Sequence, residues 1–217
     1  MKTDVIYLHG FGSDPTSHKA GFIAARLRAN GHQVFIPDLN CGDFTSLTAT
    51  GALKTADDCA ASLPGRYVVI GSSFGGYVAA LHASRHPESV AGLFMLAPAF
   101  KPLALWRHMM TEADFAAWRE RGFMDVEHFS WGKTLPLGFT FVTDFERHPE
   151  FPDISGLPCT VIHGIKDPVV PVALSREFAR LNPQTKLHEM DDVHELMASV
   201  PAICDLAAEF VEGCSTC

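Results

Sequence analysis

Residues 67–83 have the sequence YVVIGSSFGGYVAALHA. The first four residues are apolar and rich in β-branched side chains, which is typical of a buried parallel strand, and the residues after Gly75 have the composition of a helix. The turn between them, residues 71–75, has the pattern G-x-S-x-G. Its two glycines let strand and helix approach closely, and the tight turn presents the central serine at the carboxyl edge of a sheet. The sequence therefore predicts that Ser73 is an accessible nucleophile at a helix start.

A serine hydroxyl is a weak nucleophile near neutral pH, so it needs a base, and the base needs an orienting carboxylate. With a turn of this kind, the order along the chain is Ser, then Asp or Glu, then His. Asp167 follows a strand expected at residues 159–163, and His194 lies between the last expected strand and the last helix. We predict that Ser73, Asp167 and His194 form a catalytic triad.

Alternatives to these partners are present in the sequence. Asp167 could instead cap a turn, and Asp191 and Asp192 are the other candidate acids, although both lie close to His194 along the chain. His188 falls inside the expected strand, where its ring is less able to reach the edge of the sheet. The pentapeptide itself could also arise by chance, but its strand and helix flanks argue against that.

The oxyanion of a tetrahedral intermediate needs two N–H donors. One is expected from Phe74, the residue after the nucleophile. The other is expected from Phe11, in the loop that follows the first strand and the dipeptide His9-Gly10. We expect His9 to stiffen this loop.

Runs typical of strands alternate with helical patterns along most of the chain. Strands are expected at residues 5–8, 33–36, 67–70, 90–96, 159–163 and 186–190, and helices at 20–29, 47–62, 76–83, 173–181 and 201–211. Such alternation favours a mainly parallel sheet with helices on both faces. We predict an α/β protein, a three-layer α/β/α sandwich of about six strands, formed as a single domain by residues 1–217.

Residues 101–158 lack this alternation and are rich in aromatic side chains. We predict that they form a cap inserted over Ser73, which walls an apolar acyl pocket. Alternatively, the aromatic side chains serve only to pack the cap onto the body. The candidate pocket residues are His9, Trp106, Met110, Trp131 and Phe139.

Composition excludes several classes of protein. The formal net charge of −8 argues against partners with many phosphates, such as nucleic acid or an anionic membrane surface. There is no apolar run long enough to span a membrane, and the first residues show no secretory signal, so we expect a cytoplasmic location. A small acyl ester is the expected partner, and a homodimer is left open.

No metal or cofactor is expected. The six cysteines lack the spacing of a zinc site, and the terminal pair, Cys214 and Cys217, is interpreted as a tail and not as a redox motif. His82 and His86 have i, i+4 spacing on one helix, but the sequence reveals no third ligand for them.

At these motifs the chain resembles the small serine esterases of the α/β-hydrolase superfamily. Residues 7–11 (YLHGF), followed by Ser13, Ser17 and residues 19–20 (KA), are similar to the opening of YqiA-like bacterial esterases. The same opening with residues 71–76 resembles the branch of the mitochondrial acyl-protein thioesterase and acyl-glucuronide esterase. In that branch a segment similar to residues 141–148 (FVTDFERH) precedes the acid strand.

The resemblance implies an α/β-hydrolase fold and hydrolysis of carboxylic esters or thioesters, with Ser73, Asp167 and His194 as the triad. Val193 stands where the family usually has a glycine before the histidine, so a differently shaped loop is expected. The leading hypothesis is a serine carboxylesterase for short- to medium-chain acyl esters. An acyl-protein or acyl-thiol thioesterase uses the same chemistry, and a non-catalytic binding protein on this scaffold is the third alternative.

Overall fold

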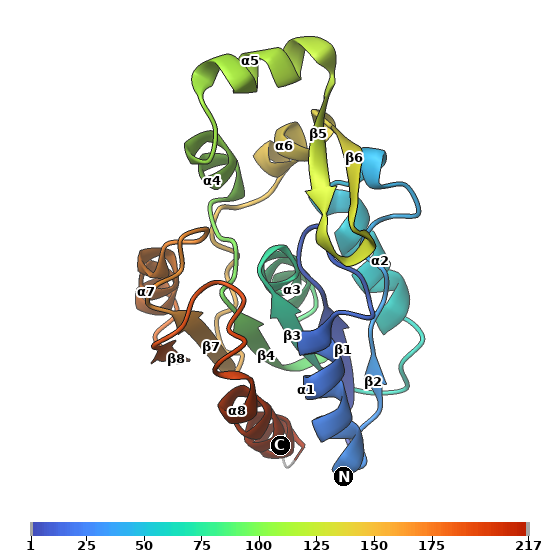
Figure 1. Cartoon of the computed structure of the whole chain (residues 1–217). Helices are drawn as coiled ribbons and strands as arrows, with labels where there is room; N and C mark the ends of the chain where they lie inside the picture. Colours follow the sequence, from blue (N-terminus) through green and yellow to red (C-terminus); the bar gives the residue numbers. More distant parts are fainter. Residues whose placement is uncertain (1, 216–217) are drawn as a thin grey trace.

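The computed structural model describes residues 2–215, so Cys217 of the terminal cysteine pair lies outside the described residues. Its centre is a six-stranded sheet in the order β2-β1-β3-β4-β7-β8, in which every pairing is parallel (Figure 1). The strands are β1 (Asp4–Leu8), β2 (Val34–Phe35), β3 (Tyr67–Ser72), β4 (Val90–Leu96), β7 (Cys159–Gly164) and β8 (Thr185–Met190). The prediction of a parallel sheet of about six strands is confirmed.

Helices cover both faces of this sheet. They are α1 (His18–Ala29), α2 (Ala49–Ala60), α3 (Phe74–Arg85), α7 (Val172–Leu181) and α8 (Val200–Cys214). Buried side chains of α1 and α8 pack together on one face, and those of α2, α3 and α7 belong to the core of the other face. The three-layer arrangement is therefore as predicted. No helix within residues 2–215 is long and apolar enough to cross a membrane.

The continuous apolar run of β3 follows from this double coverage. Val68 and Ile70 point into the core under α1 and α8, whereas Tyr67 and Val69 point into the core under α2 and α3. Successive side chains of a strand face opposite sides, so a strand buried on both sides needs apolar residues at every position.

Some predicted boundaries were wrong by a few residues. Helix α2 begins at Ala49 and not at residue 47, because the Thr48 hydroxyl accepts a hydrogen bond from the Gly51 N–H and so caps the first turn. The second strand contains only Val34–Phe35, and α8 continues to Cys214, past the predicted end at residue 211.

The segment 101–158 has more regular structure than the sequence suggested, and we call it the cap. It contains α4 (Pro102–His108), α5 (Glu112–Arg121), β5 (Phe123–His128), η2 (Phe129–Trp131), β6 (Lys133–Gly138), α6 (Thr140–Asp144) and η3 (Phe145–Arg147). Strands β5 and β6 pair as an antiparallel hairpin. These elements stand together at the top of Figure 1, and the hairpin packs beside η1 (Phe44–Ser46).

Candidate active site

Ser73 occupies the sharp turn between β3 and α3. Its backbone has φ +53° and ψ −117°, a conformation that is strained for any residue other than glycine. A Cβ at Gly71 would collide with the Gly75 carbonyl, and a Cβ at Gly75 would collide with the carbonyl oxygens of Leu8 and His9. The two glycines are thus required because backbone passes directly against backbone at this turn.

The structure brings Ser73, Asp167 and His194 together, although Ser73 and His194 are 121 positions apart in the chain. His194 Nε2 lies 3.0 Å from Ser73 Oγ, and His194 Nδ1 lies 2.7 Å from Asp167 Oδ2. A carboxylate only accepts hydrogen bonds, so Nδ1 carries the proton and the bare Nε2 accepts from the serine hydroxyl. This is the tautomer that a general base needs.

Asp167 is held as a carboxylate in a fully buried position. Its Oδ1 accepts hydrogen bonds from the N–H groups of Val169 and Val170, both at 2.8 Å, and its side chain has 0% exposure. Burial on its own raises the pKa of Asp167, but hydrogen bonds from His163, His194 and Val170 outweigh it and hold the pKa well below its usual range. The carboxyl group therefore stays charged beside the histidine.

His163 lies beside Asp167, although the sequence analysis placed it only within a strand. Its Nε2 lies 2.9 Å from the Val170 carbonyl oxygen, to which it must donate, and 3.2 Å from Asp167 Oδ2. Its Nδ1 lies 2.7 Å from Ser175 Oγ, and the ring is fully buried. His163 thus fixes both the Asp167 carboxylate and the turn that carries it. A histidine four residues before the predicted acid was the signal that could have revealed this.

The loop that carries His194 packs tightly against the end of β7. A Cβ at Gly164 would meet the carbonyl oxygens of Asp192 and Val193, the latter at 2.6 Å, so the loop depends on that glycine. The Asp192 carboxylate accepts from the N–H groups of Val193 and Ser199 at 2.8 Å and 2.9 Å. It therefore serves the loop backbone and is not the alternative acid. Val193 fits in this loop as a residue that is 42% exposed.

Two further contacts define the surroundings of the loop. Asp191, the other alternative acid, pairs at the surface with Lys166, with 2.6 Å between Oδ1 and Nζ. Lys19 Nζ donates to the Glu195 carbonyl oxygen at 2.9 Å and so ties the loop to α1. Burial lowers the pKa of Lys19 to about 8, although Glu195, Asp167 and Asp192 act in the opposite direction.

The predicted oxyanion donors lie beside Ser73. Ser73 is the N-cap of α3, so the Phe74 N–H is in the first turn of that helix, where backbone donors lack intrahelical acceptors. A Cβ at Gly10 would lie 3.6 Å from Ser73 Cβ, which brings the loop of Phe11 next to the serine. Within residues 2–215 neither the Phe11 nor the Phe74 N–H has a hydrogen-bond acceptor in the protein. Both groups are free to donate.

The chain matches a known protein family over nearly its whole length. The model of the "Uncharacterised protein family (UPF0227)" matches residues 4–208. The chain belongs to the UPF0227 family. The UPF0227 chain is also 31% identical over 149 residues to the biotin biosynthesis bifunctional protein BioHC of Teredinibacter turnerae. That alignment covers 67% of this chain and 24% of BioHC, so the chain spans about a quarter of the length of this relative.

Solved structures define the fold of this UPF0227 protein. Mouse alpha/beta hydrolase domain-containing protein 10 superposes with a TM-score of 0.82 at 19% identity, covering 97% of this chain and 90% of that chain. Est1E of Butyrivibrio proteoclasticus with bound ferulic acid superposes with a TM-score of 0.83 at 18% identity, covering 99% and 90%. The fold is the α/β-hydrolase fold.

Aromatic side chains of the cap meet the side chains of the two oxyanion candidates. The Phe11 ring centroid lies 5.2 Å from that of Trp106 and 5.3 Å from that of Phe141. The Phe74 ring lies 5.6 Å from Phe141. Of the predicted pocket residues in this UPF0227 protein, Trp106 thus contacts the ring of Phe11, and half-buried Met110 packs against the same apolar core.

Three other predicted pocket residues have different surroundings. Phe139 packs within the cap, with its ring 5.5 Å from that of Trp118. Trp131 is 42% exposed, stacks on His128 with ring centroids 3.8 Å apart, and donates to the Asp14 carboxylate. The prediction that His9 lines the pocket was wrong. Its side chain is 1% exposed, and its Nε2 accepts the Leu39 N–H while its Nδ1 contacts the Gly10 carbonyl.

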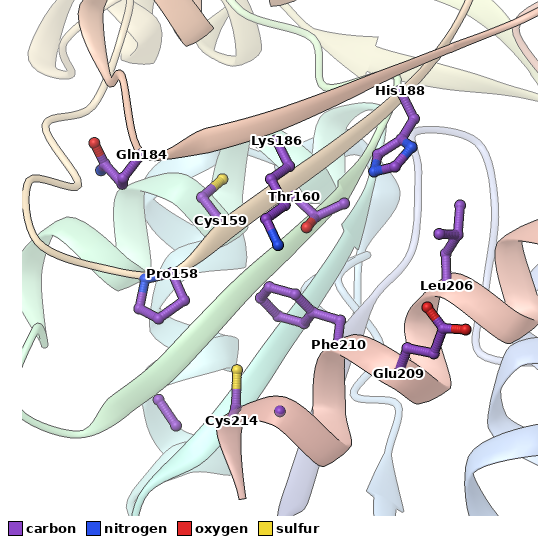
Figure 2. A pocket seen from close by; sticks show the side chains of 12 residues that line it. Pro158, Cys159, Thr160, Gln184, Lys186, His188, Leu206, Glu209, Phe210 and Cys214 are labelled. Carbon is purple, nitrogen blue, oxygen red and sulfur yellow. The ribbon is translucent and has the colours of Figure 1, made fainter. Parts of the chain in front are cut away.

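The UPF0227 chain has a pocket of about 380 Å³ that none of Ser73, Asp167 and His194 lines, and Figure 2 shows the side chains that do line it. It opens between α8 and the amino-terminal ends of β7 and β8, where Cys159, Gln184 and Lys186 line it. His188 also lines this pocket from within β8, so it is not an alternative base. Since the triad is at the carboxyl ends of the strands, this pocket has no part in its chemistry.

From the sequence, no third ligand-type residue was identified beside His82 and His86. The structure supplies one from α2, because Asp57 Oδ1 lies 2.7 Å from His82 Nδ1 and 3.2 Å from His86 Nε2. Only the packing of α2 on α3 brings these residues together, and no local pattern indicates it.

Proposed function

We propose that this protein is a serine carboxylesterase that hydrolyses short- to medium-chain acyl esters through an acyl-enzyme intermediate. The unbroken set of hydrogen bonds from Asp167 through His194 to Ser73 is the observation that supports this function most strongly. Because Asp167 is charged and fully buried, it favours the imidazolium that forms when His194 takes a proton.

In the first half-reaction, Ser73 Oγ attacks the ester carbonyl carbon while His194 Nε2 takes the hydroxyl proton. The carbonyl oxygen becomes an oxyanion and accepts hydrogen bonds from the N–H groups of Phe11 and Phe74. Collapse of the intermediate breaks the bond to the alkoxy oxygen, and His194 gives its proton to the leaving alcohol. Ser73 is left as an ester of the acyl group.

Water completes the cycle. His194 Nε2 takes a proton from a water molecule, whose oxygen attacks the acyl carbon and forms a second tetrahedral oxyanion. Breakdown of this intermediate releases the carboxylic acid, and the proton returns to Ser73 Oγ. Each turnover consumes one ester and one water molecule, releases one alcohol and one carboxylic acid, and uses no cofactor.

The cap supports the choice of acyl group. Half-buried Trp106 places aromatic surface against half-buried Phe11, whose N–H is one of the candidate donors, and buried Phe141 supports both rings. An apolar acyl chain that contacts Trp106 and Phe11 would be desolvated there. The same triad can act on a thioester, and an acyl-protein or acyl-thiol thioesterase is therefore the alternative. A thioesterase for long acyl chains needs a long apolar groove, so chain-length preference distinguishes the two functions.

Hydrolysis of p-nitrophenyl acetate, butyrate, octanoate and palmitate, beside an acyl thioester, tests the proposal with wild type and Ser73→Ala. We expect turnover of the short and medium esters that disappears in the variant. A fluorophosphonate probe should label wild type and leave Ser73→Ala unlabelled. Ester turnover that survives the substitution would falsify the assignment, and a preference for the thioester or for palmitate selects the alternative.

A further inference from the structure

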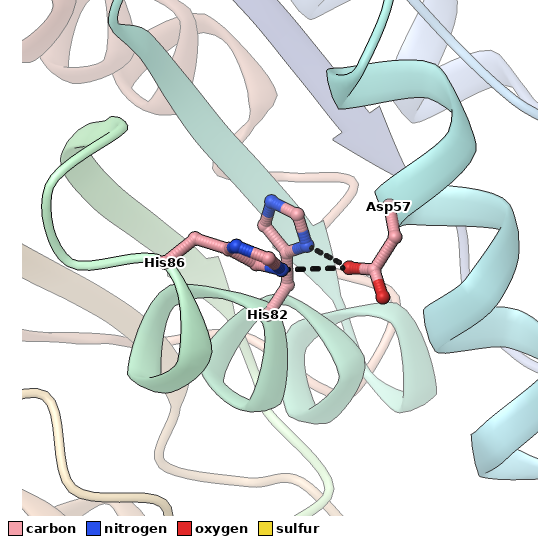
Figure 3. Close-up of side chains that lie close together, drawn as sticks. All are labelled: Asp57, His82 and His86. Atoms are coloured by element: carbon pink, nitrogen blue, oxygen red, sulfur yellow. Dashed lines mark hydrogen bonds and ion pairs between the residues drawn. The ribbon is translucent and has the colours of Figure 1, made fainter.

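Asp57, His82 and His86 form a compact group on the surface between α2 and α3, remote from Ser73 (Figure 3). The two histidines come from one face of α3 and its C-cap, and Figure 3 shows both rings directed at one oxygen of the aspartate on α2. The three ligand atoms, Asp57 Oδ1, His82 Nδ1 and His86 Nε2, all lie within 4.8 Å of one another. The ring centroids of the histidines are 4.6 Å apart.

We propose that these three residues bind Zn²⁺ with two imidazole nitrogens and one carboxylate oxygen. Zinc prefers this mixture of ligands, and it binds them at about 2.0–2.2 Å in a tetrahedron, which places neighbouring ligand atoms roughly 3.3 Å apart. The observed separations of 2.7 Å and 3.2 Å from Asp57 Oδ1 are close to that value. A small outward rotation of the carboxylate makes room for the ion.

The surroundings provide what such an ion needs besides its three ligands. A pocket of about 190 Å³ adjoins the group and is lined by the same side chains together with Tyr67 and Ser89. It gives water access to the fourth coordination position. The Asp57 and His86 side chains are 35% and 36% exposed, so an ion can reach the site, whereas His82 is 1% exposed and fixed in place.

The hydroxyl of Tyr67 is a hydrogen-bond partner for the ring nitrogen of His82 that does not face Asp57. The Tyr67 oxygen lies 2.8 Å from His82 Nε2. When Nδ1 of a neutral His82 binds the metal, the ring proton moves to Nε2 and donates to the tyrosine oxygen, so the buried ring keeps a partner at both nitrogens. Partners of this kind orient metal-bound histidines and typically contribute about tenfold to a hundredfold in affinity.

The position of the site indicates a structural role. His82 is nine residues from Ser73 along α3, which is about 13 Å of helix. An ion here joins α2 to the carboxyl-terminal end of the helix whose first turn carries the nucleophile, without touching the reacting atoms. It is therefore expected to stabilise the fold, and the inference does not depend on the proposed esterase activity.

The test is titration of tag-free, metal-free protein with Zn²⁺ by calorimetry, on wild type, Asp57→Asn, His86→Ala, Tyr67→Phe and the control His108→Ala. His108 is an exposed histidine of α4. We expect one ion per chain, affinity reduced at least about tenfold in the two ligand variants and about tenfold in Tyr67→Phe, and no change in the control. Excess Zn²⁺ should raise the midpoint of thermal unfolding of wild type by several degrees and leave Asp57→Asn unchanged.

Replacing Zn²⁺ by Co²⁺ identifies the ligands, since cysteine thiolates give a strong charge-transfer band and histidine or aspartate do not. We expect visible d–d bands without the thiolate band. Absence of saturable binding, equal binding by wild type and Asp57→Asn, or a thiolate band would each overturn the inference. If His86→Ala does not fold, Asp57→Asn and Tyr67→Phe still decide the question, because both retain the shape of the side chain.

Discussion

The substitution Asp167→Asn provides a sharp test of the triad, because the surroundings of this residue dictate how an asparagine must sit. Its carbonyl oxygen has to replace Oδ1, which accepts the N–H groups of Val169 and Val170 at 2.8 Å. In the opposite orientation of the amide, the NH₂ group would face the N–H groups of Val169 and Val170, which are themselves donors. The NH₂ group is therefore directed at His194 Nδ1, in the place of Oδ2 at 2.7 Å.

In this arrangement His194 Nδ1 must accept, so the ring proton moves to Nε2 and points at Ser73 Oγ. The imidazole can then no longer take the serine proton. Loss of the correct tautomer in a serine triad reduces kcat by about 10⁴-fold, which corresponds to about 5.5 kcal/mol at the transition state. The turn itself keeps its two backbone hydrogen bonds, so the fold should survive and KM should change little.

The assay is steady-state hydrolysis of p-nitrophenyl butyrate, with circular dichroism to establish that the variant is folded. Asp191→Asn is the matched control, because that carboxylate is 72% exposed. Within residues 2–215 its salt-bridge partner is Lys166 at the surface. We expect the control to keep the wild-type kcat. A folded Asp167→Asn protein with kcat within about tenfold of wild type would refute the tautomer reasoning.

Three further outcomes are expected from the same geometry. Gly75→Ala should lower the free energy of unfolding by about 3 kcal/mol or more in urea titrations, because the new Cβ meets backbone carbonyls. The control Gly65→Ala, whose Cβ has nothing within 4 Å, should change the free energy of unfolding by less than about 1 kcal/mol. Similar losses in both variants would contradict this reasoning. Lys19→Met removes the hydrogen bond to the Glu195 carbonyl and should lower kcat roughly tenfold at unchanged KM. Lys19→Arg should recover part of this loss. An unaltered kcat in Lys19→Met would show that the loop of His194 does not depend on this hydrogen bond. The pKa of Asp167 is lower in the folded than in the unfolded chain, so its stabilisation is complete above the unfolded value of about 4 and is lost as pH falls through the folded value. The difference in unfolding free energy between wild type and Asp167→Asn should therefore shrink below about pH 4, by up to about 1.4 kcal/mol per pH unit, and a difference that stays constant down to about pH 3 would contradict the shift.

The parts of the site that could be predicted are those that local sequence dictates. The turn at Ser73 is readable because its conformation demands glycines at 71 and 75, and the strand before it is buried on both faces. The positions of Asp167 and His194 are readable because the carboxyl ends of parallel strands meet at one edge of the sheet. Each of these features needs only a short stretch of chain and the order of the strands.

The contacts that escaped prediction join segments distant in sequence. Asp57 reaches His82 only because α2 packs on α3. The buried ring of His9 accepts a hydrogen bond from the N–H of Leu39, which is 30 residues away in the chain. The hairpin of β5 and β6 was missed although residues 124–127 alternate apolar and polar side chains, because that alternation is short and Pro136 interrupts the second strand. A pattern of local residues carries no information about which distant backbone group will satisfy a buried ring.

Phe11 and Phe74 connect the cap to the backbone beside Ser73. Each has a free backbone N–H at the nucleophile, while its ring packs against Phe141 of the cap at 5.3 Å and 5.6 Å. A shift of the cap therefore moves the rings and, through them, the backbone that holds the two donors. An N–H donor stabilises an oxyanion at a hydrogen-bond distance of about 2.7–3.1 Å, and a small displacement from that position weakens the bond. Aromatic packing in the cap is therefore expected to influence kcat as well as the choice of acyl chain.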